Sequence, residues 1–379
     1  MSGIPLVMTA KEQVRKLLKH AGVVIDGRNP WDIKVHDERL YAKVLGHGAL
    51  GLGESYMDGW WDCEKLDELF DRVLAAQLDR RVTAGLALHG LKHRVFNLQR
   101  YRPFHIGEAH YDLDNDLYQA MLGRRMVYTC GYWKNASNLD AAQESKLELV
   151  CRKIGLKRGD RVLDIGGGWG SFAKYASQKY GASVVAITVS KNQVALGREL
   201  CKGLKGVEIR YQDYHDVNEK FDHIVSLGMF EHVGPKNYAA YFDVVRRCLK
   251  DDGLFLLHTI GSNRSVTSTD EWTNRYIFPD GVLPSIAQIG KAIEGRFVME
   301  DWHNFGAEYE KTLLAWHSNF KRAWPSLERK DPAKYNDRFC RMWTYYLLSC
   351  AGSFRARKNQ LWQVVLSKDG VPGGYQPVR

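Results

Sequence analysis

The sequence predicts an α/β fold, in which a parallel sheet carries helices on both faces and follows a small, mostly helical N-terminal domain. The first observation is a regular alternation of strand-like and helix-like segments beyond residue 138. The second is the length of 379 residues, which is enough for two or three domains. The third is a composition of 45% hydrophobic and 26% charged residues, which is typical of a folded protein.

The N-terminal region has short and mixed patterns. Helical spacing covers Lys11 to His20, and a glycine-rich passage covers Gly46 to Trp61. We therefore divide the chain into an accessory domain over residues 1–90, a basic linker over 91–107 and a larger domain over 108–379.

Positive charge is concentrated just before the larger domain. The chain has 54 Lys and Arg against 44 Asp and Glu, and the net charge of +10 favours nucleic acid, phospholipid headgroups or acidic metabolites as partners. Between Arg80 and Gly107 six basic residues and no acid are interleaved with apolar side chains. This pattern suits a helix on an anionic membrane and equally a linker helix packed between domains, and the spacing leaves both open. The six are Arg80, Arg81, Lys92, Arg94, Arg100 and Arg102.

Strands and helices alternate in the larger domain. Leu147, Val150 and Ile154 have helical spacing, and a buried strand then runs into a glycine turn over 161–170. The segment 262–295 breaks the alternation, and we expect it to be inserted over the carboxyl edge of the sheet, where open α/β sheets bind ligands. The other strand-like runs are 183–189, 207–212, 221–228, 253–261, 297–305 and 361–367, with helical patterns at 191–202, at 236–249 and after residue 310.

Neither a membrane span nor a disulfide framework is predicted. No uncharged apolar run approaches the roughly 18 residues that cross a bilayer. The start MSGIPLVMTAKEQ lacks basic residues before its short apolar patch, which argues against a secretory signal. The seven cysteines are odd in number, scattered and without a CxxC pair, so we expect reduced thiols, no metal site and a cytoplasmic protein.

The glycine turn after the first strand of the larger domain is a candidate ligand site. Its glycines allow close backbone approach, and the following helix offers free N–H groups. Gly166, Gly168 and Gly170 give the spacing GxGxG, which does not match the GxGxxG of dinucleotide sites. Asp164 directly before them suits a ligand with a positive charge and a ribose, such as S-adenosylmethionine. The alternative is a tight turn without a ligand.

Two further segments are expected at the same sheet edge. The second strand of the larger domain ends in Thr188 to Gln193, and the third ends in Gln212 and Asp213. Asp213 has the acceptor oxygens for an adenine amine, although a loop Asp is more commonly a helix N-cap.

The chain resembles the cyclopropane-fatty-acyl-phospholipid synthases over nearly its whole length. The shorter mycolic-acid cyclopropane synthases share the catalytic half, whereas the N-terminal domain resembles that of the phospholipid-acting branch. The resemblance implies a Rossmann-like class I methyltransferase sheet and a lipid-binding accessory domain. It rests on Gly51 to Trp61, His110 to Tyr118, Tyr128 to Trp133, Gly228 to Tyr238, Leu256 to Ser262, Tyr276 to Gly281, Asp301 to Gly306 and Ser349 to Arg357.

The activity implied by the resemblance is transfer of a methylene group from S-adenosylmethionine to the cis double bond of an unsaturated acyl chain in a phospholipid. Gly167 replaces the usual Cys of the family's glycine loop, where we expect a backbone contact. In place of the acid that most methyltransferases carry after the second strand, the family uses the TxSxNQ segment. The implied cofactor residues are Tyr128, Thr129, Asp164, Gly166, Gly168, Gly170, Thr188, Ser190, Gln193, Gln212 and Asp213.

The resemblance also implies a bound bicarbonate that acts as the base. Glu231, His258 and Tyr309 match the family positions that hold it, with backbone N–H contacts from Cys130 and Ile260. Each has a plainer interpretation, because a strand-end His is usually structural, Glu231 and His232 would serve as a helix N-cap pair, and Tyr309 would merely pack. We expect Cys350 to line the site without acting as a nucleophile.

Aromatic residues near these motifs suit the chemistry. Attack by an alkene leaves a carbocation, which aromatic faces stabilise through their quadrupoles without trapping it. The candidates are Tyr132, Trp133, Tyr276, Phe278, Tyr309 and Tyr346.

The expected partners are an anionic phospholipid surface on the inner face of the membrane and the unsaturated phospholipid itself. The family suggests a homodimer, and no nucleic-acid-reading motif is present. One alternative is an S-adenosylmethionine-dependent C- or N-methyltransferase that yields a methyl-branched lipid or a methylated amine. Another, from a different class, is a non-catalytic lipid-binding module.

Overall fold

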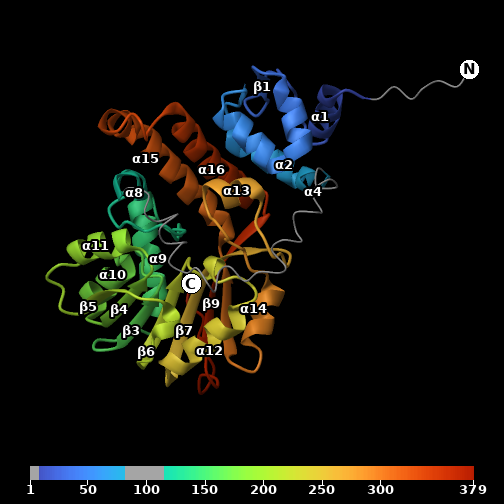
Figure 1. Cartoon of the computed structure of the whole chain (residues 1–379). Helices are drawn as coiled ribbons and strands as arrows, with labels where there is room; N and C mark the ends of the chain where they lie inside the picture. The colour runs from blue at the N-terminus through green and yellow to red at the C-terminus, as the bar shows by residue number, and fades with distance from the viewer. Residues whose placement is uncertain (1–7, 82–114) are drawn as a thin grey trace, which may run out of the picture.

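Seven strands form one sheet in the larger domain of the computed structural model, which describes residues 8–81 and 115–379. They lie in the order β5-β4-β3-β6-β7-β9-β8 (Figure 1). Every strand-like run of the larger domain is a strand of this sheet. The strands are β3 Arg161–Ile165, β4 Ser183–Thr188, β5 Val207–Tyr211, β6 Phe221–Leu227, β7 Leu249–Ser262, β8 Val298–Asn304 and β9 Asn359–Ser367.

The sheet is mixed, so the prediction of a parallel sheet is right only for its first five strands. β5, β4, β3, β6 and β7 pair in parallel. β9 lies between β7 and β8 and runs antiparallel to both. The cause is the connection from β8 to β9, because two mutually packed helices, α15 (Tyr309–Lys330) and α16 (Asp337–Arg355), return the chain to the edge that it left.

Helices cover both faces of the sheet, as predicted. Alternate residues of a strand point to opposite faces. In β3, Leu163 and Ile165 pack in one core with α12 and α14, whereas Val162 packs in another with α9 and α10. The bounds are α9 Leu139–Lys153, α10 Ser171–Tyr180, α11 Lys191–Leu200, α12 Tyr238–Cys248 and α14 Ile286–Ile293.

The described residues of the N-terminal domain pack mainly against the helices beyond the sheet (Figure 1). Its helix α3 packs along α16, and α2 packs against α16 and α13. Arg355 Nη2 of α16 lies 2.6 Å from Asp67 Oδ2 of α3, which ties the two parts together. The elements are α1 Ala10–Lys19, β1 Lys34–Val35, α2 Arg39–Met57, β2 Trp61–Asp62, α3 Leu66–Ala75 and α4 Leu78–Arg81.

The insertion predicted at 262–295 divides into two parts. Its first half, with α13 (Glu271–Tyr276), lies over the carboxyl edge as expected and packs on α2. Its second half forms α14, which packs on α12 because Ile289 and Ile293 join the core on that face of the sheet. The prediction of an edge insertion is therefore right for the first half only.

Two predictions lie largely outside the described residues. The basic stretch from Arg80 to Gly107 is described only as far as the end of α4, and the boundary between residues 90 and 91 is not described. α8 (Asn115–Leu122) is the next described helix. Within the described part, none of the helices is both long and apolar enough to cross a membrane, and all seven cysteines are free thiols.

Candidate functional site

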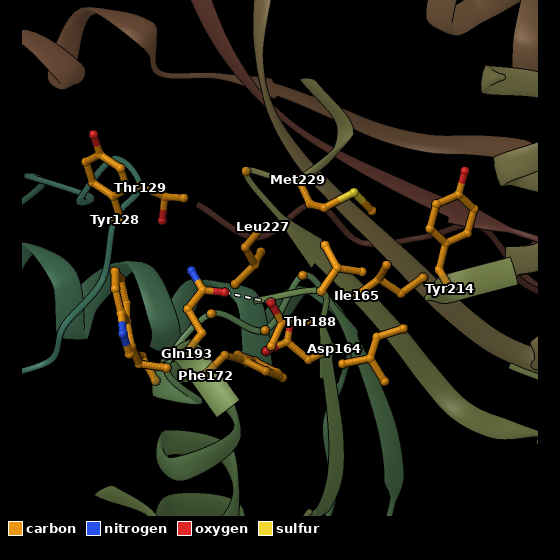
Figure 2. A pocket seen from close by; sticks show the side chains of 18 of the residues that line it. Tyr128, Thr129, Asp164, Ile165, Phe172, Thr188, Gln193, Tyr214, Leu227 and Met229 are labelled. Atoms are coloured by element: carbon orange, nitrogen blue, oxygen red, sulfur yellow. Dashed lines mark hydrogen bonds between the residues drawn. The ribbon is translucent and has the colours of Figure 1, made fainter. Parts of the chain in front are cut away.

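A first cavity opens at the carboxyl ends of β3, β4, β5 and β6, which is the edge that the sequence predicts. Figure 2 shows Asp164, Thr188, Gln193 and Tyr128 converging on it from separate segments. Its wall includes most of the predicted cofactor residues: Tyr128, Thr129, Asp164, Gly166, Gly168, Thr188, Gln193, Gln212 and Asp213.

The glycine turn supplies the floor of the first cavity. Gly166 and Gly168 have φ angles of 79° and 56°, which L side chains adopt only under strain. A Cβ on Gly166 would lie 2.5 Å from Met229 Cβ, so this position also lacks room for a side chain. The turn therefore presents bare backbone to a ligand.

Two buried ionisable groups, Asp164 and Lys146, line this part of the cavity. Asp164 is 1% exposed, and burial raises its pKa to about 7 although Lys146 opposes the shift. Burial likewise lowers the pKa of Lys146 to about 8. Lys146 Nζ donates to Thr129 Oγ1 at 2.8 Å, and Gln143 Nε2 donates to the Thr129 carbonyl oxygen at 2.8 Å. Asp164 Oδ1 has no protein partner, which leaves an acceptor for a cationic ligand group.

Two predicted cofactor residues do not reach the first cavity. Ser190 is the N-cap of α11, where its Oγ accepts from the Gln193 N–H at 3.2 Å. Gly170 is the N-cap of α10 with φ 79°, and a Cβ there would meet Ile209 and Cys201 in the core. Both residues shape the loops behind the wall. The segment Thr188 to Gln193 reaches the cavity instead through its two end residues, which are joined by a 2.6 Å hydrogen bond (Figure 2).

Asp213 is a helix N-cap, which is its plainer interpretation, and it also lines the first cavity. Its Oδ1 accepts from the His215 backbone N–H at 2.8 Å and lies 2.7 Å from His215 Nδ1, so it caps the short helix Tyr214–Asp216. Gln212 precedes it on the cavity wall.

A second cavity of about 570 Å³ adjoins the first one. Tyr128, Thr129, Gly228 and His232 line both, so a ligand in the first cavity borders the second directly. The second cavity contains the predicted residues Glu231, His258, Ile260, Tyr309 and Cys350. His232, which the sequence leaves as a structural residue or one just behind the site, lines both walls.

Glu231 and His258 face the second cavity as buried groups with one unsatisfied atom each, Glu231 Oε2 and His258 Nε2. Burial raises the pKa of Glu231 to about 7, although the hydrogen bond from the Ile260 N–H lowers it. Burial lowers the pKa of His258 well below its usual range, and the charges of Lys146 and Lys153 lower it further. His258 is thus neutral. Its Nδ1 lies 3.3 Å from Gln363 Nε2, and with this amide group as the donor the ring carries its proton on Nε2.

One of the two predicted backbone contacts has another partner in this structure. The Ile260 N–H donates to Glu231 Oε1 at 2.7 Å and so holds the carboxylate. The backbone contact from Cys130 stays a prediction, and the fully buried Cys130 Sγ lies 3.9 Å from Thr312 Oγ1. Cys350 does line the second cavity, and burial raises its pKa to about 12, which keeps it a thiol and agrees with a lining role.

Only half of the predicted aromatic residues face the second cavity. Phe278, Tyr309 and Tyr346 line it. Tyr132 packs on Phe305, Trp133 Nε1 donates to Thr312 Oγ1, and Tyr276 OH donates to Glu54, so these three act in packing. Tyr128, predicted as a cofactor residue, also lines this wall, which contains further aromatic residues that the sequence did not indicate: Phe70, Trp272, Tyr345 and Phe354.

Lys146 and Gln143 were missed as site residues. Both lie on α9 at helical spacing with Leu147 and Val150, on the stripe that faces the core. A lysine and a glutamine on a buried stripe are the signal that could have found them, since such groups are buried only with partners or a function.

Comparison with known proteins agrees with this geometry. A family model described as mycolic acid cyclopropane synthetase matches residues 99–364. The cyclopropane-fatty-acyl-phospholipid synthase of Escherichia coli strain K12 is 52% identical over 96% of this chain and 94% of its own length. A solved cyclopropane synthase from Mycobacterium tuberculosis is 27% identical with a TM-score of 0.65, over 70% of this chain and 98% of that one. A mycolic acid cyclopropane synthase solved with SAH and CTAB has the same TM-score and coverage at 29% identity. The chain therefore belongs to the mycolic acid cyclopropane synthetase family of S-adenosylmethionine-dependent methyltransferases.

Proposed function

We propose that the protein transfers a methylene group from S-adenosylmethionine to the cis double bond of an unsaturated acyl chain in a phospholipid and so forms a cyclopropane ring. One observation carries this proposal: the first cavity, with a glycine turn and a buried acid, opens through four shared residues into an apolar, aromatic-lined cavity. This arrangement brings a polar cofactor and a hydrocarbon chain into contact without water between them.

The residues of the first cavity fit S-adenosylmethionine. The bound molecule supplies an electrophilic methyl group on a positively charged sulfur. Asp164 Oδ1 is a free acceptor for a cationic group, and Gly166 and Gly168 leave the backbone open beside it. Thr188 and Gln193 present polar atoms from the next strand end, where ribose hydroxyls find partners.

The residues of the second cavity hold the alkene and stabilise charge. An alkene is a weak nucleophile, so the wall must keep it in line with the methyl group. The rings of Tyr128, Phe278 and Tyr346 lie together where the two cavities meet, with Tyr128 and Tyr346 joined by a 2.9 Å hydrogen bond. Their faces lower the energy of a carbocation and offer no strong nucleophile that would capture it.

Glu231 and His258 fit a bound bicarbonate. The ion would supply the base that removes the proton before the ring closes. Its oxygens need donors, and the protonated Nε2 of His258 is one unsatisfied donor in this wall. Glu231 has a pKa raised to about 7 and one unpartnered oxygen, so it can share a proton with an anion that it would otherwise repel.

The accessory domain, the basic linker and the assembly complete the proposal. We assign residues 1–90 to lipid binding, 91–107 to a basic linker and 108–379 to catalysis. In this proposal the protein is a cytoplasmic homodimer that attaches peripherally to the inner face of the membrane. The cationic stretch before the catalytic part supports the membrane attachment, because it attracts anionic headgroups.

The test is incubation of the purified protein with labelled S-adenosylmethionine and vesicles of an unsaturated phospholipid, followed by mass analysis of the acyl chains. The expected product is heavier than the substrate chain by one CH₂ and has lost its double bond. An absence of label in the lipid would overturn the proposal.

The same assay separates the rival reaction. A methyl-branched saturated chain gains two further hydrogens and requires an added reductant, whereas cyclopropanation does not. Label in a headgroup amine would instead indicate N-methylation.

A further inference from the structure

A third cavity, of about 690 Å³, lies in the N-terminal domain. Its wall is built by α1, α2, α3 and α4 together with the segment that leads into α13. Most of the wall is aliphatic, and the described residues that line it include no Lys or Arg. The aliphatic side chains are Val14, Leu17, Leu18, Ile25, Ile33, Val35, Leu40, Val44, Leu50, Leu52, Leu69, Val73, Leu74 and Leu78.

An interruption in α2 helps to keep this space open. Gly48 has φ 52° and ψ −126°, a conformation outside the helical region in the middle of the helix. Gly48 and Ala49 therefore present almost no side chain to the cavity at the point where α2 bends. A well-packed small domain would fill a space of this size with side chains, so an apolar void here indicates a ligand.

The third cavity adjoins the second. Seven residues line both. Ala49 is one of them and is exposed, so the shared boundary reaches the protein surface. The seven are Ala49, Phe70, Leu74, Asp79, Thr269, Asp270 and Tyr345.

Charged groups gather at this shared boundary. Lys358 Nζ lies 3.0 Å from both carboxylate oxygens of Asp79, and Lys358 and the exposed Arg264 also line the second cavity. Asp270 lies on both walls. Two apolar cavities thus share one polar rim, which holds the Lys358–Asp79 ion pair and the carboxyl group of Asp270, and groups of both charges suit a zwitterionic headgroup with two hydrocarbon chains.

We propose that the third cavity binds the second acyl chain of the same phospholipid whose unsaturated chain occupies the second cavity. The inference rests on the proposed function for the choice of ligand. The N-terminal domain then selects a diacyl substrate by burying the chain that does not react, and the rim between α4 and Lys358 holds the headgroup.

Photo-cross-linking tests the site without requiring turnover. The probe is a phosphatidylethanolamine with an unreactive saturated chain that ends in a diazirine, presented in vesicles to the full-length protein. We expect adducts on peptides from residues 14–44, which line the third cavity and not the second, and a probe labelled on the unsaturated chain should mark residues 228–361 instead. Adducts of the saturated-chain probe only outside 14–44 would overturn the inference. Full cross-linking without any cyclopropane product would contradict the proposed function and leave this site standing.

A cavity-filling variant provides a second test of the proposed acyl-chain site. Val44 lines the third cavity alone, so Val44→Phe fills it without touching the second. We expect Val44→Phe to lower kcat/KM for a diacyl phospholipid about tenfold and to leave turnover of a single-chain lysophospholipid unchanged. The matched control is Val24→Phe, because Val24 is 54% exposed on the same domain and lines no described cavity. Equal losses on both substrates, or no loss on either, would overturn the inference.

Discussion

At the scale of single residues, the site depends on ionisable groups that are buried with few partners. Asp164, Lys146 and Glu231 all have pKa values shifted toward neutrality by burial, to about 7, 8 and 7. Such groups cost stability in an empty protein, because charge is poorly solvated in the interior. Such groups are retained where a ligand completes the missing interactions, as the cofactor would in the first cavity and the proposed anion in the second.

Glu231→Gln should lower turnover by a factor of about 100 or more, because the amide cannot share a proton with the bound base. The amide oxygen still accepts from the Ile260 N–H, so the fold should persist. The measurement is label transfer to vesicles, with lipid binding followed by co-sedimentation. Glu294→Gln, at an exposed helix end, is the matched control and should keep full activity. Activity near the wild-type level in Glu231→Gln would remove this carboxyl group from the mechanism.

Glu231 should also make stability depend on pH. Its pKa rises from 4.5 to about 7 on folding, so the unfolded chain releases this proton at a lower pH than the native protein does. Relative to Glu231→Gln, the wild-type protein should therefore lose about 3 kcal/mol of unfolding free energy as the pH rises from about 4.5 to about 7, and little more above that. Urea unfolding of both proteins at pH 5 and pH 8 measures the difference. A constant difference across this range would show that Glu231 titrates normally.

At the scale of elements, the carboxyl ends of four parallel strands place the cofactor groups. The strands fix where each segment leaves the sheet, and caps such as Ser190 on α11 and Asp213 on the helix Tyr214–Asp216 fix how the loops turn. The β3–α10 turn is the tightest of these joints, with three glycines at positive φ.

Gly166→Ala tests whether the glycine turn contacts the cofactor, and a control variant must separate that contact from the backbone strain that any side chain causes at a positive φ. Gly155→Ala is the control, because Gly155 also has a positive φ of 62° but has nothing within 4 Å of an added Cβ. Each substitution should cost about 1–2 kcal/mol of stability from the left-handed conformation. Gly166→Ala should in addition weaken S-adenosylmethionine binding in calorimetry, since its Cβ would lie 2.5 Å from Met229 Cβ in the cavity wall. Equal cofactor affinity in the two variants would show that the turn does not touch the cofactor.

At the scale of the whole molecule, the N-terminal domain completes a series of adjoining cavities. The first cavity borders the second through Tyr128 and Thr129, and the second borders the third through Phe70 and Tyr345. The path therefore runs from the sheet edge, past α16, into the N-terminal helices. Under our proposal, the contact between the domains is part of the lipid site and not only a structural support.

Membrane attachment is the corresponding prediction at this scale. Changing Arg80, Arg81, Lys92 and Arg94 together to Ala should weaken co-sedimentation with anionic vesicles, most clearly at low salt, because each cation near the surface contributes to the attraction. The matched control changes four exposed lysines of the catalytic part to Ala, namely Lys157, Lys179, Lys202 and Lys205. Unchanged binding of the first variant, or equal loss in both, would contradict a membrane-facing linker.

Sequence patterns predicted the site best where a residue's role depends on its own segment. Gly166, Asp164 and Thr188 reach the cavity because each stands directly at the end of a strand. Gly170 and Ser190 miss it, because the chain rotates toward the core within one or two residues of the strand end or turn. Spacing along the chain does not fix that rotation.

The sequence by itself determined the strands, the helices on both faces, the glycine turn and the family, because alternation, helical spacing and turn residues are local properties of the chain. Only the tertiary structure decided that β9 runs antiparallel, that Lys146 and Gln143 support Thr129, and that three cavities adjoin. These features arise where segments distant in sequence pack together. Their energies depend on burial and on the partner's position, and neither can be read from a single segment.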